Sequence, residues 1–320
     1  MKKNIKKEVE NYDLIIIGAG IAGLSAAMYG ARLGMRILCL GTTSGSEMPV
    51  GGMITTTNVL ENYPGIERIS GIEFANNLRK HAESYDLVKI KEEKVESIEK
   101  NEDYFIVKSE KGSYSGKTIL FATGSVWKKL DVPGGKEFEN KGVAYCAMCD
   151  APLFKKKIVA VVGGSNSAVK YAIILAEYAN KVYIIYRKEK LRADAANLKK
   201  IENNNKIEII NNANIVKIIG DRSVKAIYLD REFKGSKELK VDGVFVAIGY
   251  VPSSELAKKI GVKINEAGEI VIDHKTCETN VKGVYAAGDV VDSQFKQAIG
   301  AASGGCRAAF SAYDYIKREK

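Results

Sequence analysis

The stretch "YDLIIIGAGIAGLSAAMYGARLGMRILCL", Tyr12–Leu40, decides the fold. An apolar run, a glycine-rich turn, an alanine-rich segment and a second apolar run predict strand, tight turn, helix and strand. Gly18, Gly20 and Gly23 form GxGxxG where the first strand hands over to the helix. Gly18 permits the turn, Gly20 lets a pyrophosphate approach the backbone, and Gly23 lets helix and strand pack closely. The turn therefore predicts dinucleotide binding through residues Gly18, Gly20, Ile21, Ala22 and Gly23, with plain helix–strand packing as the alternative.

A second copy of this pattern is "KIVAVVGGSNSAVKYAIILAEYANKVYIIYRKEKLRA", 157–193. It predicts a strand at 158–162, a helix through about Tyr178 and a strand at 181–186. Its first fingerprint glycine is Gly163, but Ser165 and Ala168 occupy the second and third positions. Alanine is tolerated at the third position, whereas a serine at the second crowds the place where phosphate meets backbone. The nucleotide-binding candidates of this turn are Gly163, Gly164, Ser165, Asn166 and Ser167.

Basic residues follow the last strand of this second copy. Arg187, Lys188 and Arg192 cluster in "YRKEKLR". Since basic residues at this place accommodate a 2′-phosphate and acidic residues bind the ribose hydroxyls, the cluster favours NADPH over NADH. The alternative is a solvated basic helix start.

A third signature is "TNVKGVYAAGDVVDSQFKQAIGAASGGCRAAFSAYDYI", 279–316. It predicts a short strand at 283–287 that ends in Gly288 and Asp289, then a small-residue helix from about Gln297. Such an aspartate can hydrogen-bond sugar hydroxyls, although "AAGD" alone could be a tight turn. The first and third signatures serve one nucleotide, so the domain between them is inserted. We expect an α/β fold with two dinucleotide-binding, Rossmann-like, three-layer domains: 1–124 with 253–320, and 125–252.

Two cysteines and a carboxylate stand in "YCAMCD", 145–150. Cys146 and Cys149 at this spacing can open and close a disulfide, and Asp150 is placed to exchange a proton with one of them. The alternatives are half a zinc site, inert core cysteines and, for Asp150, a turn or helix cap. The other cysteines are isolated from one another and from both histidines, so we expect no metal.

Composition narrows the function classes. The chain has 320 residues, a formal net charge of +10 and five cysteines. No apolar run approaches the roughly 18–20 residues of a membrane span, so we expect a cytoplasmic location and no membrane contact. The basic residues are mostly scattered lysines matched by many glutamates, with little aromatic interleaving, which argues against nucleic-acid binding.

Over essentially its whole length the sequence resembles the low-molecular-weight thioredoxin reductases. The motifs are "GAGIAGLSAA", "GGMITTTNVLENYPG", "ILFATGS", "YCAMCDAPLF", "VVGGSNSAV", "VFVAIGYVP", "GVYAAGDV" and "FKQAIGAASGG". The resemblance implies a homodimer that contains FAD, takes electrons from NADPH and reduces thioredoxin. Cys149 would exchange electrons with the flavin, Cys146 would attack thioredoxin, and Asp150 is our hypothesised general acid/base. FAD would contact the first turn together with Gly52, Asn62, Ala122, Thr123, Gly124, Gly288, Asp289, Gln297 and Ala298.

Because one flavin face cannot hold both the nicotinamide and the disulfide, the inserted domain is expected to rotate between two orientations. The family is known for this alternation. We expect hinges near 124–127 and 250–253.

The sequence departs from the family pattern in several places. The loop 41–52 is longer, no acidic residue directly follows Leu40, and Met53 replaces a glutamine. Ser165, Lys170 and Tyr186 replace a glycine, a glutamate and a histidine on the nucleotide side. NADPH remains the first expectation for the donor; NADH, reduced ferredoxin or a deazaflavin are the alternatives. The acceptor could also be a glutaredoxin-like or peroxiredoxin-linked carrier, and a flavin-bound redox sensor is the non-enzyme alternative.

Overall fold

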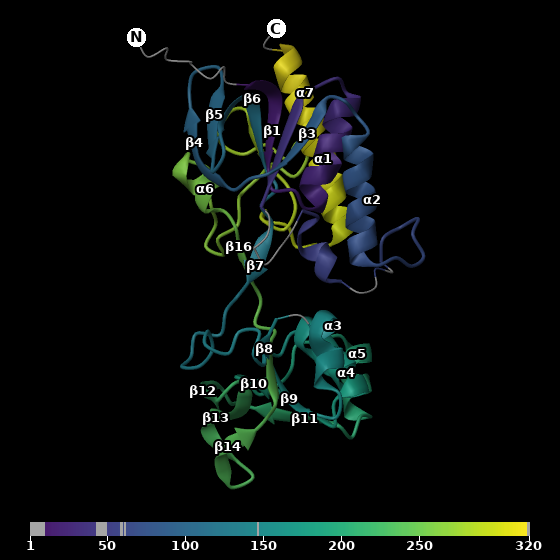
Figure 1. Cartoon of the computed structure of the whole chain (residues 1–320), viewed down its shortest axis with the longest axis vertical. Coiled ribbons are helices and arrows are strands. Elements are labelled where there is room, and N and C mark those ends of the chain that lie inside the picture. The colour runs from purple at the N-terminus through teal and green to yellow at the C-terminus, as the bar shows by residue number, and fades with distance from the viewer. Residues whose placement is uncertain (1–9, 43–49, 58–59, 61, 146, 319–320) are drawn as a thin grey trace. The chain divides into compact units, whose positions relative to one another are not determined.

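The chain forms two compact units in the computed structural model, which describes residues 10–42, 50–57, 60, 62–145 and 147–318. Unit 1 comprises Met1–Val126 and Pro252–Lys320, and unit 2 comprises Trp127–Val251. The expected boundaries were after residue 124 and before residue 253. The chain passes between the units through β7 (Ser125–Trp127) and β16 (Tyr250–Pro252), which pair as a two-stranded sheet (Figure 1).

Unit 1 is built on a sheet in the order β3-β2-β1-β6-β5-β4, with β17 also paired to β6. The pairs among β3, β2, β1, β6 and β17 are parallel, and β4 and β5 form an antiparallel extension. The strands are β1 (Glu10–Ile17), β2 (Ile37–Gly41), β3 (Val88–Glu92), β4 (Val95–Lys100), β5 (Phe105–Ser109), β6 (Ser113–Phe121) and β17 (Val284–Ala286).

The helices α1, α2 and α7 of unit 1 lie together beside this sheet (Figure 1). Side chains of a strand alternate between the two faces. Leu14 and Ile16 accordingly pack in the cluster with α1 and α7, while Ile15 and Ile17 pack in the cluster on the other face. The bounds are α1 (Ile21–Arg32), the 3-10 turn η1 (Gly52–Thr56), α2 (Gly71–Glu83), α6 (Glu255–Lys259) and α7 (Ala298–Arg318).

Unit 2 repeats this plan with a parallel sheet in the order β11-β10-β9-β15-β8. The antiparallel sheet β12-β13-β14 shares one hydrophobic cluster with it, and α4 and α5 share the other. The strands are β8 (Val143–Ala144), β9 (Ile158–Val162), β10 (Lys181–Tyr186), β11 (Ile207–Asn211), β12 (Ile215–Gly220), β13 (Val224–Phe233), β14 (Ser236–Lys240) and β15 (Gly243–Val246). The helical segments are α3 (Ala147–Asp150), the 3-10 turn η2 (Ala151–Phe154), α4 (Asn166–Tyr178) and α5 (Ala195–Glu202).

The fold class expected from the sequence is confirmed: an α/β protein with two Rossmann-like domains, the second inserted into the first. In each unit the strand order reverses beside the first strand, at β1 with β6 and at β9 with β15. Ligands of such sheets bind at the carboxyl ends of the strands where the order reverses. Both glycine turns lie at such a place. No helix in the described part of the chain is both long and apolar enough to cross a membrane.

Candidate active site

The first glycine turn is fixed by close backbone contacts. Gly18 directly follows β1 and has φ 106°, and a Cβ on it would lie 2.3 Å from the carbonyl oxygen of Ala122, the residue after β6. A Cβ on Gly23 in α1 would lie 1.9 Å from the Gly18 carbonyl oxygen. These two glycines are therefore required by the fold itself, whether or not a ligand is bound.

Gly20 differs from its two neighbours in the fingerprint. Its φ is −81°, and a Cβ there would have its nearest contact at 3.8 Å, the Cα of Gly52. The chain would therefore accept a side chain at this position, so the glycine leaves open space that a pyrophosphate fits. Helix α1 starts here with no side-chain cap and no acidic residue in its first turn. Its first N–H groups are left for an anion such as the FAD pyrophosphate.

The loop before η1 is attached to this turn. The Gly51 N–H donates to the Ala19 carbonyl at 2.8 Å, and Gly20 and Gly51 form a parallel bridge. A Cβ on Gly52 would come within 3.0 Å of the Gly20 Cα. Most of the longer loop expected here, 43–49, lies outside the described residues, as do 58–59 and 61.

Two residues expected at the flavin meet across 235 positions of sequence. The Asn62 Nδ2 group donates to Gln297 Oε1 at 3.0 Å, and Ala298 then begins α7. Helix α7 approaches α1 closely, because a Cβ on Gly305 would lie only 2.1 Å from the Ala22 carbonyl oxygen. Ile21 and Ala22 are themselves buried, so their side chains belong to the core.

Asp289 follows β17 at the same end of the sheet. Gly288 has φ 84°, and its Cβ would lie 3.1 Å from that of Ala22. Burial raises the pKa of the Asp289 carboxyl, and the nearby Lys296 ammonium opposes that shift. The Asp289 carboxylate accepts no hydrogen bond from the described residues, which leaves it available for a ligand hydroxyl. The chemistry of this end of unit 1 thus fits the sugar-like chain of FAD.

The end of β6 is held by the segment that re-enters unit 1. The Thr123 hydroxyl donates to the Ser253 carbonyl at 2.7 Å, and the Ser253 N–H donates to the Gly124 carbonyl at 3.0 Å. Gly124 has φ 63° and no atom near the position of a Cβ. Thr123 and the Gly124 carbonyl are thus engaged inside the chain, and the Ala122 N–H donates to the Ile17 carbonyl at 2.8 Å.

The second glycine turn copies the first almost contact for contact. Gly163 directly follows β9 and has φ 135°, and its Cβ would lie 2.3 Å from the carbonyl oxygen of Ala247, the residue after β15. The Arg192 N–H donates to the Gly164 carbonyl at 2.7 Å, as Gly51 does to Ala19 in the first turn. Ser165 takes the place of Gly20: it is exposed, precedes α4, and does not cap that helix with its side chain.

Other residues of the second turn are occupied by the protein. A Cβ on Gly164 would lie 2.4 Å from the Tyr186 ring, so this glycine makes room for a buried tyrosine whose hydroxyl has no partner among the described residues. The Asn166 side chain bonds the Asp194 carboxylate and accepts from Asn197 Nδ2 at 2.7 Å. Of Asn166 only the backbone is then offered to phosphate, whereas Ser167 is exposed and its hydroxyl is bonded to no described residue.

The basic cluster at the end of β10 is exposed. Arg187, Lys188 and Arg192 form no salt bridge with any described acidic residue, and Lys170 on α4 is exposed as well. Such an uncompensated cluster beside a helix N-terminus is suited to a phosphate group.

The CxxC segment is described only in part. Cys146 lies outside the described residues, and of Cys149 only its membership of α3 is described. Asp150 ends α3, is half-buried, and does not cap the following η2 with its side chain. Burial raises the pKa of the Asp150 carboxyl. A carboxyl group of raised pKa beside a cysteine is suited to proton transfer at neutral pH.

Helix α4 supports this segment from one side. The Tyr171 hydroxyl donates to the carbonyl of Tyr145, the residue before Cys146, at 3.0 Å. The Tyr145 ring also stacks on Trp127 with 6.0 Å between the ring centroids.

The other three cysteines belong to unit 1. Cys39, Cys277 and Cys306 are free thiols whose pKa is raised by burial. Within the described ranges no three side chains of His, Cys, Asp or Glu gather as a metal site.

The comparisons with known proteins agree with this arrangement. The profile of the family described as "Pyridine nucleotide-disulphide oxidoreductase" matches residues 12–305. A protein of Staphylococcus aureus strain Mu50 that is part of its alkyl hydroperoxide reductase is 38% identical over 97% of this chain, and the NADH dehydrogenase of Bacillus subtilis strain 168 is also 38% identical over 97%. The chain spans 60% and 59% of the lengths of these two relatives. The crystal structure of Lactococcus lactis thioredoxin reductase is 34% identical, with a TM-score of 0.86 over 96% of this chain and 99% of that one.

The chain therefore belongs to the pyridine nucleotide-disulphide oxidoreductase family. The resemblance of its sequence to the low-molecular-weight thioredoxin reductases within that family is confirmed. It is thus an enzyme of a family that implies a flavin and a pyridine nucleotide.

Three residues of this region were not expected from the sequence. Gly51 holds the loop onto the first turn, Gly305 lets α7 approach α1, and Lys296 binds the Asp289 segment. The pairs "GG" at 51–52 and 304–305 were visible signals for two of them. A lone lysine carries no such signal.

Proposed function

We propose that the protein is a flavin-dependent disulfide reductase of the thioredoxin reductase type. It would take electrons from NADPH, hold FAD in unit 1 and reduce a thioredoxin-like protein through Cys146 and Cys149. The observation that carries the proposal is Asp150, a half-buried carboxyl of raised pKa directly after the second cysteine. Asp150 is not exposed and its side chain does not cap η2, so neither a solvated turn aspartate nor a helix cap is supported as the alternative.

Bound FAD would supply the two-electron chemistry that links a hydride donor to a disulfide. The residues that would hold it are the backbone of Gly18 to Gly23, with Asn62, Asp289 and Gln297 at the flavin end. Their side chains would bind and orient it, while Asp150 would move a proton to or from the cysteine pair during thiol exchange.

NADPH is our first choice of donor because the exposed cations at the end of β10 have no acidic partner among the described residues. Ser165 weighs against it, since its side chain stands where the first turn has the open Gly20. The name of the Bacillus subtilis relative, an NADH dehydrogenase, keeps NADH as the second choice.

The acceptor has two candidates. The structural relative named above is a thioredoxin reductase, which favours a thioredoxin-like protein. The Staphylococcus aureus relative is part of an alkyl hydroperoxide reductase, which favours a peroxide-reducing partner with a disulfide. A homodimer in the cytoplasm is part of the same proposal.

Anaerobic titration of the purified protein tests the donor first. We expect the flavin absorbance to bleach with a small excess of NADPH and to require more NADH. A flavin that stays oxidised with both but bleaches with dithionite would exclude a nicotinamide donor and direct the search to ferredoxin or a deazaflavin. Addition of thioredoxin, or of a peroxiredoxin, to the reduced protein then identifies the acceptor by the rate at which the absorbance returns.

A further inference from the structure

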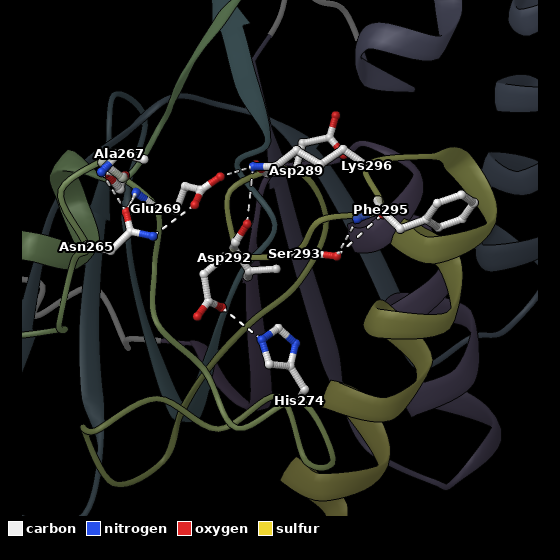
Figure 2. Close-up of polar contacts among 12 residues, drawn as sticks. Asn265, Ala267, Glu269, His274, Asp289, Asp292, Ser293, Phe295 and Lys296 are labelled. Atoms are coloured by element: carbon white, nitrogen blue, oxygen red, sulfur yellow. Dashed lines mark hydrogen bonds and ion pairs between the residues drawn. The ribbon is translucent and has the colours of Figure 1, made fainter. Parts of the chain in front are cut away.

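A single ammonium group holds the segment between β17 and α7. Lys296 Nζ donates to Glu269 Oε1 at 2.5 Å, to the Asp289 carbonyl at 2.9 Å and to the Val291 carbonyl at 3.2 Å (Figure 2). An ammonium group has three protons, so these three acceptors use all of them. The side chains of Lys296 and Glu269 are 31% and 19% exposed, which shields the pair partly from water.

Glu269, the charged acceptor of the Lys296 ammonium, belongs to a turn that is held by several hydrogen bonds. Asn265 Nδ2 donates to Glu269 Oε2 at 2.9 Å, and Asn265 Oδ1 accepts from the N–H groups of Ala267 and Glu269 at 3.0 and 2.9 Å (Figure 2). Backbone bonds join the two segments as well: the Ile270 N–H donates to the Val290 carbonyl at 2.9 Å. Glu269 is therefore a fixed anchor for Lys296.

The segment that Lys296 binds carries two of the residues assigned to the flavin. It fixes the backbone of Asp289 directly, and it immediately precedes Gln297, whose amide oxygen accepts from Asn62. We propose that Lys296 is a positioning residue of the FAD site, which holds the backbone of Asp289 in place. This inference rests on the proposed function, because it requires FAD to bind in unit 1.

The positive charge of Lys296 also affects the pKa of the Asp289 carboxyl. Burial raises the pKa of Asp289 and Lys296 lowers it, so the lysine favours the ionised carboxylate. The neighbouring charged groups are Glu269, the Asp292–His274 pair at 3.2 Å, and Arg307, which donates to the His274 carbonyl. Without Lys296, Asp289 loses the positive charge that opposes the effect of burial on its pKa.

The consequence is a pH dependence of FAD binding. An ionised carboxylate accepts a ligand hydroxyl more strongly than a protonated one, so FAD affinity should fall as the pH drops through the Asp289 pKa. Removal of Lys296 raises that pKa and moves the fall in affinity to higher pH.

The test measures the Kd of FAD for the apoprotein by flavin fluorescence, across mildly acidic to mildly alkaline pH. We expect Lys296→Met to weaken binding about tenfold, the effect of losing one bond to a charged group, and to shift the pH midpoint upward. Lys296→Arg should restore both values. Lys258→Met, at an exposed lysine of α6, is the matched control and should change neither.

Glu269→Gln supplies a second readout: it removes the charged partner of Lys296 but leaves the two carbonyl contacts of the ammonium, so it should weaken FAD binding less than Lys296→Met does. A Lys296→Met protein with the wild-type Kd and pH profile would overturn the inference. So would a loss of affinity that is equal at every pH and not restored by arginine, because that pattern indicates a purely structural role. If the unaltered protein binds no FAD, the proposed cofactor fails, and this inference with it.

Discussion

At the scale of single residues, Asp150 is the proposed general acid/base. Its pKa is raised by burial, so the acid form persists to higher pH than in an ordinary aspartate. As a general acid it would protonate a cysteine leaving group, and the rate of disulfide reduction should fall as pH rises through this pKa. Asp150→Asn should lower that rate by about a hundredfold or more, remove this limb of the pH profile and leave flavin content unchanged. Asp131→Asn, at an exposed aspartate of the same unit, is the control for stopped-flow measurement.

At the same scale, Arg187 and Arg192 are the residues proposed to select NADPH over NADH. Both are exposed at the end of β10 and have no acidic partner among the described residues. Replacing both with alanine should raise the KM for NADPH by about tenfold, because two charge-assisted contacts to a 2′-phosphate are lost, while the KM for NADH changes little. Lys190→Ala, an exposed lysine in the same turn, is the control in steady-state assays. An equal effect on both nucleotides would mean that these are surface charges.

At the scale of elements, the first strand–turn–helix separates glycines that serve the fold from one that serves a ligand. A Cβ at position 23 meets a carbonyl oxygen at 1.9 Å, so Gly23→Ala should destabilise the protein by about 3 kcal/mol or more. A Cβ at position 20 has its nearest contact at 3.8 Å, so Gly20→Ala should leave the melting temperature of the apoprotein unchanged but weaken FAD binding by about 1–3 kcal/mol. Thermal melts with and without FAD distinguish these effects. Gly20→Ala with normal FAD affinity would show that the pyrophosphate does not approach there.

The same elements explain what the sequence could predict. The spacing of Gly163, Ser165 and Ala168 was sufficient to predict the second strand–turn–helix, because such a unit is a local structure. The observed β9, α4 and β10 lie within a residue or two of their expected bounds. The engagement of Asn166 by Asp194 and of Lys296 by Glu269 was not predictable. Those contacts depend on how loops far apart in sequence are packed, and no local pattern of residue types records that.

At the scale of the whole molecule, the two units share the same strand–turn–helix arrangement but differ at one residue position of the turn. In both units a glycine at the end of the first strand lies against a carbonyl at the end of the strand across the switch point. A later backbone N–H donates to the residue before the helix N-cap in both as well, from Gly51 in unit 1 and from Arg192 in unit 2. The units differ at the position where phosphate would meet backbone, Gly20 in one and Ser165 in the other. The copy in unit 1 keeps the GxGxxG pattern, whereas the copy in unit 2 departs from it at the second and third positions. This difference is expected if, as we propose, unit 1 holds FAD tightly and unit 2 binds NADPH reversibly.

The insertion itself makes a prediction about independent folding. The chain leaves unit 1 and returns to it at neighbouring points, since the Ser253 N–H donates to the Gly124 carbonyl at 3.0 Å. Unit 1 also has hydrophobic clusters on both faces of its sheet that contain no residue of 127–251. Replacing 127–251 with a short Gly/Ser linker should therefore leave a folded protein, because closing a short loop costs little entropy.

This shortened protein should bind FAD, since every residue assigned to that cofactor remains in unit 1, but it should no longer be reduced by NADPH at the wild-type rate. Flavin absorbance, a melting temperature that rises on addition of FAD, and anaerobic NADPH titration measure these three properties. A shortened protein that is folded yet fails to bind FAD would mean that the inserted unit contributes to the flavin site. That result would overturn the proposal that unit 1 alone holds FAD. Rapid bleaching by NADPH in the shortened protein would instead place the nucleotide site outside 127–251, and the basic cluster of β10 would lose its assigned role.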